Sequence, residues 1–217
     1  MISIKYNFLY VHVPKTAGNA VQNVLRLYSE DKVVRLSAYQ DGLERFEVRN
    51  DRFNIQKHST LRDYQRELGD GALAGLFKFC CVRNPWERAI SFYFSPHRGV
   101  AAWDRMAFLR LLDEMLPISA FLQLESAAGP AQARSPAASP SPFQNVDFVM
   151  RYERLEEDFQ TVCRRLGIPV QTLPVRNKST REHFSQYYDP ELVEHVRQRF
   201  ADEVEFFGYE FDPAVRA

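Results

Sequence analysis

Residues 8–28 read FLYVHVPKTAGNAVQNVLRLY, and this stretch decides the fold. Its first part, residues 8–13, is short, apolar and rich in aromatic and β-branched residues, which is typical of a buried strand. Residues 14–19 form a turn, and apolar residues then recur at helical spacing over residues 21–28. The pattern therefore predicts a strand, a loop and a helix in direct succession.

A second unit of the same kind reads LFKFCCVRNPWERAISFY over residues 76–93. Residues 76–82 predict another buried strand, which the Arg-Asn-Pro turn at residues 83–85 ends. Pro85 suits the first position of a helix that runs over residues 86–94. Further patterns predict a strand at residues 146–150 and helices at residues 59–68, 108–121 and 155–166 and from residue 190 onward.

Strands that alternate with helices predict an α/β, three-layer, P-loop-like fold with a central parallel sheet flanked by helices. We expect one domain over residues 1–217, with ligands bound at the carboxyl ends of the strands. Residues 33–54 are mixed and charged, with a short strand around Phe53 and Ile55. Residues 127–142 are rich in Ala, Ser and Pro and predict a flexible loop.

The composition excludes several classes of function. The chain has 28 Lys and Arg against 28 Asp and Glu, which argues against a non-specific binder of nucleic acid or of membrane surfaces. Its three cysteines show neither a zinc spacing nor a disulfide framework. The first residues lack a signal peptide and no run is long enough for membrane insertion, so we expect a soluble cytoplasmic protein.

The first strand-to-helix turn has the parts of an anion site. A helix N-terminus presents unpaired N–H groups, Gly18 permits close approach, and Lys15 supplies a positive charge. Thr16 and Asn19 can donate hydrogen bonds. Because the lysine precedes the glycine, the nucleotide P-loop pattern is only partly met, which disfavours a kinase or NTPase. An ordinary turn with a surface lysine remains the structural alternative.

The second turn suits a phosphate monoester. Arg83 follows the strand and Ser91 lies eight residues later, about two turns into the helix, so both side chains can converge on one phosphate. The alternative assigns Arg83 to a salt bridge at the helix start and Ser91 to packing. We expect Arg88 to pair with an acid and brace the helix, and Trp86 and Tyr93 to lie in the core.

These loops resemble those of sulfotransferases that use 3′-phosphoadenosine 5′-phosphosulfate (PAPS). Residues 13–20, VPKTAGNA, resemble the 5′-phosphosulfate loop, most closely in the carbohydrate branch that includes heparan sulfate 2-O-sulfotransferase. Asn19 stands where that branch often has Ser or Thr. Residues 83–93 match the family's 3′-phosphate motif, Arg-(Asp/Asn)-Pro-x-x-Arg-x-x-Ser-x-(Tyr/Phe), at every position.

The resemblance implies PAPS as co-substrate and PAP as product, and we expect no metal because no carboxylate cluster follows the first loop. The donor contacts that it implies are Lys15, Thr16, Ala17, Gly18, Asn19, Ala20, Arg83 and Ser91. A later basic loop resembles the segment that closes over the nucleotide in that branch, which implies further contacts from Lys178, Ser179, Thr180 and Arg181. The alternative for this later segment is a solvated loop.

His58 is the candidate general base. It lies between the two phosphate loops and its unshifted pKa is near neutrality. The related branch has a catalytic histidine in a similar place, although a structural histidine at a helix start is the alternative. We expect Lys15 to stabilise charge on the leaving oxygen. Of the other histidines, we interpret His12 as buried and hydrogen-bonded, His97 as a candidate for the acceptor cleft, and His183 and His195 as peripheral.

The resulting hypothesis is a bacterial-type sulfotransferase that moves a sulfuryl group from PAPS to an acceptor hydroxyl. A saccharide is the favoured acceptor because of the branch that the loops resemble. Peptide tyrosine, a lipid and a small metabolite are the alternative acceptors. A nucleotide kinase and a non-catalytic PAP-binding protein are the alternative functions.

Overall fold

The computed structural model describes residues 1–38, 44–100, 102–125, 141–174 and 181–213. The flexible loop predicted at residues 127–142 therefore lies outside the described residues, apart from its last two.

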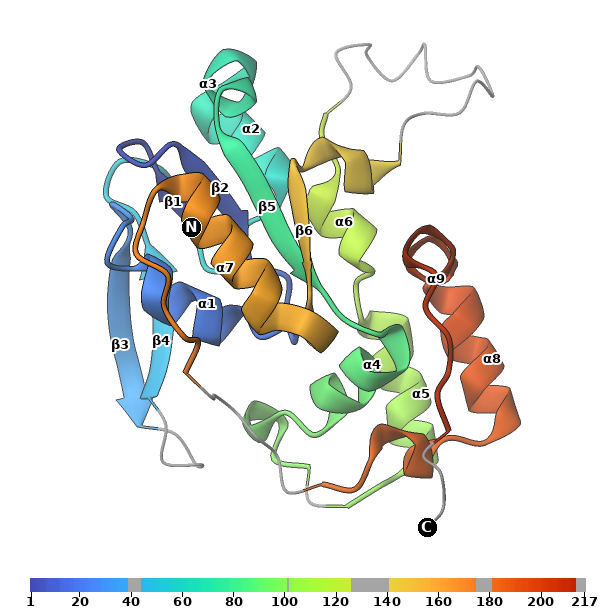
Figure 1. The fold of residues 1–217 in the computed structure, drawn as a ribbon. Coiled ribbons are helices and arrows are strands. Elements are labelled where there is room, and N and C mark those ends of the chain that lie inside the picture. Colours follow the sequence, from blue (N-terminus) through green and yellow to red (C-terminus); the bar gives the residue numbers. More distant parts are fainter. Residues whose placement is uncertain (39–43, 101, 126–140, 175–180, 214–217) are drawn as a thin grey trace.

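A four-stranded sheet lies at the centre of the molecule (Figure 1). Its strands are β1 (Ile2–Ser3), β2 (Phe8–Val11), β5 (Phe77–Val82) and β6 (Phe148–Arg151), in the order β1-β2-β5-β6. The last three are parallel, as the alternation of strands and helices predicted. The antiparallel edge strand β1 is an addition that the sequence patterns did not indicate.

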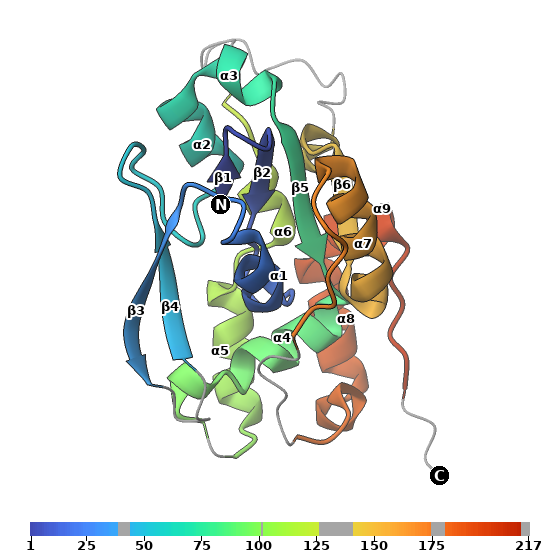
Figure 2. The ribbon, with the colours of Figure 1, turned by 60° about the vertical axis from the view of Figure 1, so that its left-hand side comes forward.

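Helices cover both faces of this sheet, so the predicted three-layer α/β fold is confirmed (Figures 1 and 2). Side chains alternate along each strand, so Phe8 and Tyr10 point to one face and Leu9 and Val11 to the other. The first face packs against α1 (Gly18–Leu25) and α7 (Leu155–Leu166). The second packs against α2 (Leu61–Leu68), α3 (Asp70–Ala74), α4 (Pro85–Tyr93), α5 (Arg105–Glu114), α6 (Ile118–Leu122), α8 (Pro190–Arg199) and α9 (Ala201–Phe207).

Two predicted elements were wrong in detail. The single helix expected at residues 108–121 is broken between α5 and α6, because Pro117 cannot donate a helical hydrogen bond and Met115 is already extended. The mixed segment at residues 33–54 contains an antiparallel hairpin of β3 (Lys32–Ala38) and β4 (Glu44–Arg49). The short strand expected around Phe53 and Ile55 is irregular chain.

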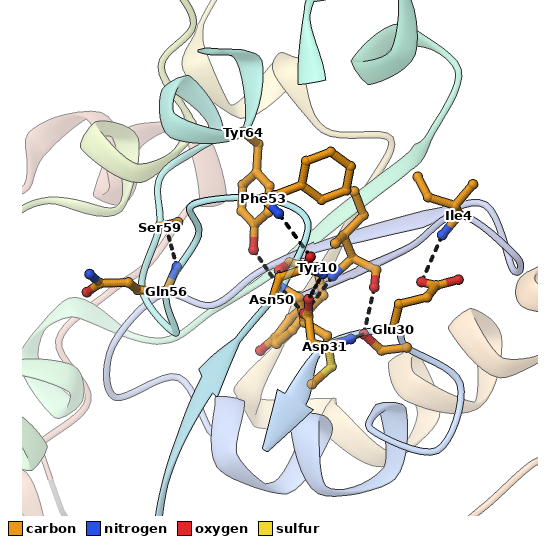
Figure 3. A network of polar contacts seen from close by, with 12 residues as sticks. Ile4, Tyr10, Glu30, Asp31, Asn50, Phe53, Gln56, Ser59 and Tyr64 are labelled. Carbon is orange, nitrogen blue, oxygen red and sulfur yellow. Dashed lines mark hydrogen bonds and ion pairs between the residues drawn. The ribbon is translucent and has the colours of Figure 1, made fainter. Parts of the chain in front are cut away.

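A network of carboxylates ties this hairpin to the edge of the sheet (Figure 3). Asp31, just before β3, accepts a hydrogen bond from the Ile2 backbone at 2.9 Å and one from the Asn50 side chain at 2.7 Å. The neighbouring Glu30 accepts backbone hydrogen bonds from Ile4 and Lys5, each at 3.0 Å. Both ends of the hairpin are therefore fixed relative to β1.

Arg88 is a structural brace, as predicted. Its guanidinium is fully buried and lies 3.6 Å from the buried carboxylate of Glu203 on α9. The same side chain donates to the carbonyl oxygens of Pro14 at 3.3 Å and Leu116 at 2.9 Å. The ion pair thus connects α4 to α9, and the hydrogen bond to Pro14 connects α4 to the loop after β2.

Replacing Glu203 by Ala leaves the Arg88 charge buried without its partner. We expect the free energy of unfolding to fall by about 3–5 kcal/mol, because an uncompensated buried charge is costly. Urea denaturation measures this loss. The double variant Arg88→Met/Glu203→Leu should recover most of it, since no charge is then buried. Unchanged stability of Glu203→Ala would show that the pair is not coupled.

Candidate functional site

A pocket of about 900 Å³ opens beyond the carboxyl ends of β2 and β5. Among the residues predicted for the site, those that line it are Lys15, Ala17, Gly18, Asn19, Ala20, His58, Arg83, Ser91 and Arg181. They come from segments that are far apart in the sequence. Residues Lys178, Ser179 and Thr180, which were predicted with them, lie outside the described residues.

The loop after β2 turns sharply to reach α1. Lys15 and Ala17 adopt φ values of 70° and 68°, in the left-handed region that is uncommon for residues with a side chain. The Thr16 hydroxyl is buried and donates to the Val13 carbonyl at 2.9 Å, so it stabilises the turn and does not line the pocket. Ala17 gives α1 no side-chain cap, so the first N–H groups of the helix are available to a ligand.

Arg83 joins the two predicted phosphate loops. Its guanidinium donates to the Lys15 carbonyl at 3.1 Å and to the Glu87 carboxylate at 2.5 Å, and it stacks on the Tyr152 ring with 3.7 Å to the ring centroid. Asn84 caps α4 by accepting from the next turn, so Pro85 begins the helix as predicted. Ser91 lies on the same helix and faces the same pocket.

The pocket concentrates positive charge. Burial, together with the charges of Arg83, Arg181 and Lys57, lowers the pKa of Lys15 to about 8. Burial and the neighbouring Arg83 also lower the pKa of Arg181. Both shifts come first from burial and then from neighbouring positive charges, so several cations lie close together in the pocket.

Two of these cations have N–H donors that no protein acceptor in the described residues satisfies. Within the described ranges, the Nε atom of Arg83 and one terminal nitrogen of Arg181 are buried without an acceptor. Buried donors of this kind usually have a partner, and in a cationic pocket an anionic ligand is the natural acceptor. The arrangement is therefore suited to binding phosphate or sulfate groups.

His58 lies in the wall of the same pocket. Its Nδ1 is 3.0 Å from the carbonyl oxygen of His12. Since a carbonyl oxygen only accepts hydrogen bonds, Nδ1 carries the proton and the lone pair is on Nε2. Desolvation by the surrounding protein lowers the pKa of His58 although part of the residue is exposed, so the ring is neutral near pH 7. A neutral imidazole with a free Nε2 can take a proton from a bound hydroxyl.

The structure also brings in residues that sequence reasoning missed. His183 was interpreted as peripheral, yet it lines the pocket beside Glu182 and Phe184, and this interpretation was wrong. The physical reason is that the segment before α8 packs against α4, so His183 reaches the pocket together with the predicted Arg181. His195 is peripheral on α8, as predicted, and Trp86 and Tyr93 are buried in the core.

Further lining residues with no sequence signal of their own are His12, Lys57, Glu87, Phe92, Ser95, Arg98 and Tyr152. Glu87 accepts a hydrogen bond from the Arg83 guanidinium, and the Tyr152 ring stacks on it. The Ser95 hydroxyl lies 3.4 Å from the Lys15 amine. His12 is buried as predicted, but its Nδ1 has no well-formed hydrogen bond within the described residues, although Gln22 is near. The predicted burial of His12 is therefore confirmed, whereas its Nδ1 lacks, in the described part of the chain, the hydrogen bond that the interpretation included.

Comparison with known proteins identifies the family. A model described as "Sulfotransferase family" matches residues 1–115 and 133–210. The chain belongs to the sulfotransferase family. A search of the curated proteins found no match for this family member. A solved structure, a sulfotransferase from Alicyclobacillus acidocaldarius, has 14% sequence identity and a TM-score of 0.34. The match covers 64% of this chain and 57% of that one, so the chain spans little more than half of that sulfotransferase.

Among the helices that the structure describes, none combines the length and the hydropathy that crossing a bilayer requires. The His, Cys, Asp and Glu side chains form no group of three or more that could hold a metal ion in the part of the chain that the structure describes.

His58 should titrate below the usual histidine range, because burial disfavours its charged form. We expect ¹⁵N NMR of histidine-labelled protein to show His58 neutral at pH 7, with the proton on Nδ1. The same measurement on the protein unfolded in urea provides the reference. A proton on Nε2 would contradict the assigned hydrogen bond to His12.

Proposed function

We propose that this protein transfers a sulfuryl group from PAPS to the hydroxyl of an acceptor and releases PAP. The observation that carries the proposal is the hydrogen bond from Arg83 to the Lys15 carbonyl, because it places the two predicted phosphate loops against one pocket. PAPS carries a phosphosulfate at its 5′ position and a phosphate at its 3′ position, so binding it needs two anion sites that are held at a constant separation. Membership of the sulfotransferase family supports the same donor.

We assign the 5′-phosphosulfate to the loop after β2. Lys15 supplies a charge there, and the N–H groups at the start of α1 supply hydrogen bonds and a partial positive charge. We assign the 3′-phosphate to Arg83 and Ser91, with Arg181 as a further cation. The open nitrogens of Arg83 and Arg181 support this assignment, because a phosphate oxygen would satisfy them.

In the proposed reaction the acceptor oxygen attacks sulfur and the bond from sulfur to the 5′-phosphate oxygen breaks. The hydroxyl proton passes to Nε2 of His58, and the electron pair of the broken bond stays on the phosphate of PAP. Lys15 offsets the charge that develops on that oxygen, which lowers the barrier more in a buried site than in water. His58 is suited to its role because its Nδ1 is already held by the His12 carbonyl.

For the acceptor we propose a saccharide hydroxyl. The support is the resemblance of residues 13–20 to the loop of carbohydrate sulfotransferases. Aromatic and polar side chains that line the same pocket as His58, including Phe92, Ser95 and Arg98, can contact both the faces and the hydroxyls of a sugar ring.

Removing either principal cation should weaken PAP binding. We expect Lys15→Ala and Arg83→Ala each to raise the dissociation constant for PAP about 10- to 100-fold, the usual effect of losing a charge-assisted hydrogen bond. Isothermal titration calorimetry measures this constant. Exposed Lys5 and Arg164 provide matched controls, and Lys5→Ala and Arg164→Ala should bind PAP as the wild type does.

The same calorimetry has a pH dependence with a defined sign. The Lys15 ammonium is present below its pKa of about 8 and is lost above it, so PAP affinity should fall as the pH rises from 7 to 9. Lys15→Arg should flatten this fall, because a guanidinium stays charged over the range. If pure, folded wild-type protein takes up no PAP at millimolar concentration, the proposed function is wrong.

His58→Gln tests the assignment of the base. Glutamine keeps a polar side chain but cannot accept the proton, so kcat should fall about 10²- to 10⁴-fold while PAP affinity changes little. Radiolabelled PAPS with a panel of saccharide acceptors gives kcat, and calorimetry gives the affinity. A variant with unchanged turnover would assign the base to another residue.

A further inference from the structure

His12 is a buried titratable residue whose side chain has no role in the proposed reaction. It directly follows β2 and precedes the loop, and its side chain is only 3% exposed although it lines the pocket. Its ring contacts both halves of the proposed machinery. On one side is Gly18 at the start of α1, and on the other is the ring of His58.

The contact with Gly18 is unusually close. A Cβ atom at position 18 would lie 1.9 Å from both Cδ2 and Nε2 of His12. The imidazole therefore occupies the space that any side chain at position 18 would need, and the first turn of α1 rests directly on it. This requirement for glycine is steric, because the φ of Gly18 is not among the positive values of the chain.

The contact with His58 has two parts. The backbone carbonyl of His12 accepts the hydrogen bond from Nδ1 of His58 at 3.0 Å. The two imidazole rings also pack together, with 4.5 Å between their centroids. The carbonyl sets the tautomer of His58, and the ring of His12 restricts the directions in which Nε2 can point.

We propose that His12 is a positioning residue that sets the distance between the donor loop and the base. The inference rests on the proposed function and adds to it the element that couples its two halves. In-line transfer requires the acceptor oxygen, sulfur and leaving oxygen to align, and a misplacement of ~1 Å can cost about 100-fold in rate. One ring wedged between Gly18 and His58 is a rigid means of maintaining that alignment.

The surroundings of His12 favour packing over charge as the basis of this role. Burial lowers its pKa well below the usual histidine value, and the nearby His58 and Lys57 lower it further. Tyr10 stacks on the ring from the same strand, with 6.0 Å between centroids. The ring is therefore neutral and held on several sides.

A double-mutant cycle between positions 12 and 18 tests the proposal. Gly18→Ala in the wild type should raise the dissociation constant for PAP about tenfold or more, because the new methyl displaces the His12 ring and the loop with it. In a His12→Ala background the space is open, so adding Gly18→Ala should change PAP affinity less than about threefold, well below the single-variant effect. Gly71→Ala is the matched control, since nothing lies within 4 Å of a Cβ at that position.

Turnover separates positioning from simple support of the loop. His12→Ala should lower kcat about 100-fold, and the double variant should remain as low, because the ring that orients His58 is missing in both. The KM for PAPS should change far less than kcat. His12→Asn, which keeps a polar group and a smaller volume, provides the same test if the alanine variant does not fold.

The outcomes are distinct. Equal losses of PAP affinity from Gly18→Ala in both backgrounds, or wild-type kcat in His12→Ala, would overturn the positioning role while the proposed function stands. A wild-type protein that binds no PAP would overturn the proposed function, and with it the inference. If Gly18→Ala weakens PAP binding in the wild type but hardly changes it in the His12→Ala background, while kcat stays low in both His12→Ala variants, the result supports the proposed function and the inference.

Discussion

The contact on which the site depends is the hydrogen bond from Arg83 to the Lys15 carbonyl. It joins the loops that follow β2 and β5, which are adjacent and parallel in the sheet, and its two residues are 68 positions apart in the chain. Parallel pairing places both strand ends at one edge, and this bond then fixes how the two following loops face each other. Arg88 adds a second connection through the Pro14 carbonyl, and it is itself held by Glu203 on α9. The pocket is therefore supported from the sheet below and from the helical layer behind.

The electrostatic arrangement follows from that geometry. Burial and the nearby Arg83 charge lower the pKa values of Lys15 and Arg181, and Glu87 neutralises only part of the positive charge by pairing with Arg83. Holding like charges together without a ligand is unfavourable, and an anion that enters the pocket relieves this cost. The buried apolar side chains on both faces of the sheet stabilise the folded state and so offset the cost of these neighbouring charges. This division of stable core and strained rim is expected where a protein binds a highly charged ligand.

The glycine in the first loop shows how packing and chemistry are combined. In nucleotide-binding loops a glycine usually lets the backbone approach the ligand, and Gly18 lines the pocket in a way that fits this use. The structure adds a requirement from the opposite side, where the His12 ring fills the space next to the Gly18 Cα. The same residue thus lines the pocket and accommodates a buried side chain. Left-handed conformations at Lys15 and Ala17 complete the sharp turn that this packing needs.

Local patterns in the sequence were sufficient for the two strand-loop-helix units, for the α/β class and for the cationic residues of both loops, because strand and helix periodicity and phosphate chemistry are properties of short segments. They were insufficient for the β3–β4 hairpin, whose charged strands carry weak periodicity, and for the break at Pro117 that separates α5 from α6. They also missed His183, Tyr152 and the contact between His12 and Gly18, since these depend on which distant segments meet at the pocket. Chemistry that resides in one segment can be read from the chain, whereas the distances between segments are set only when the sheet and its helices pack.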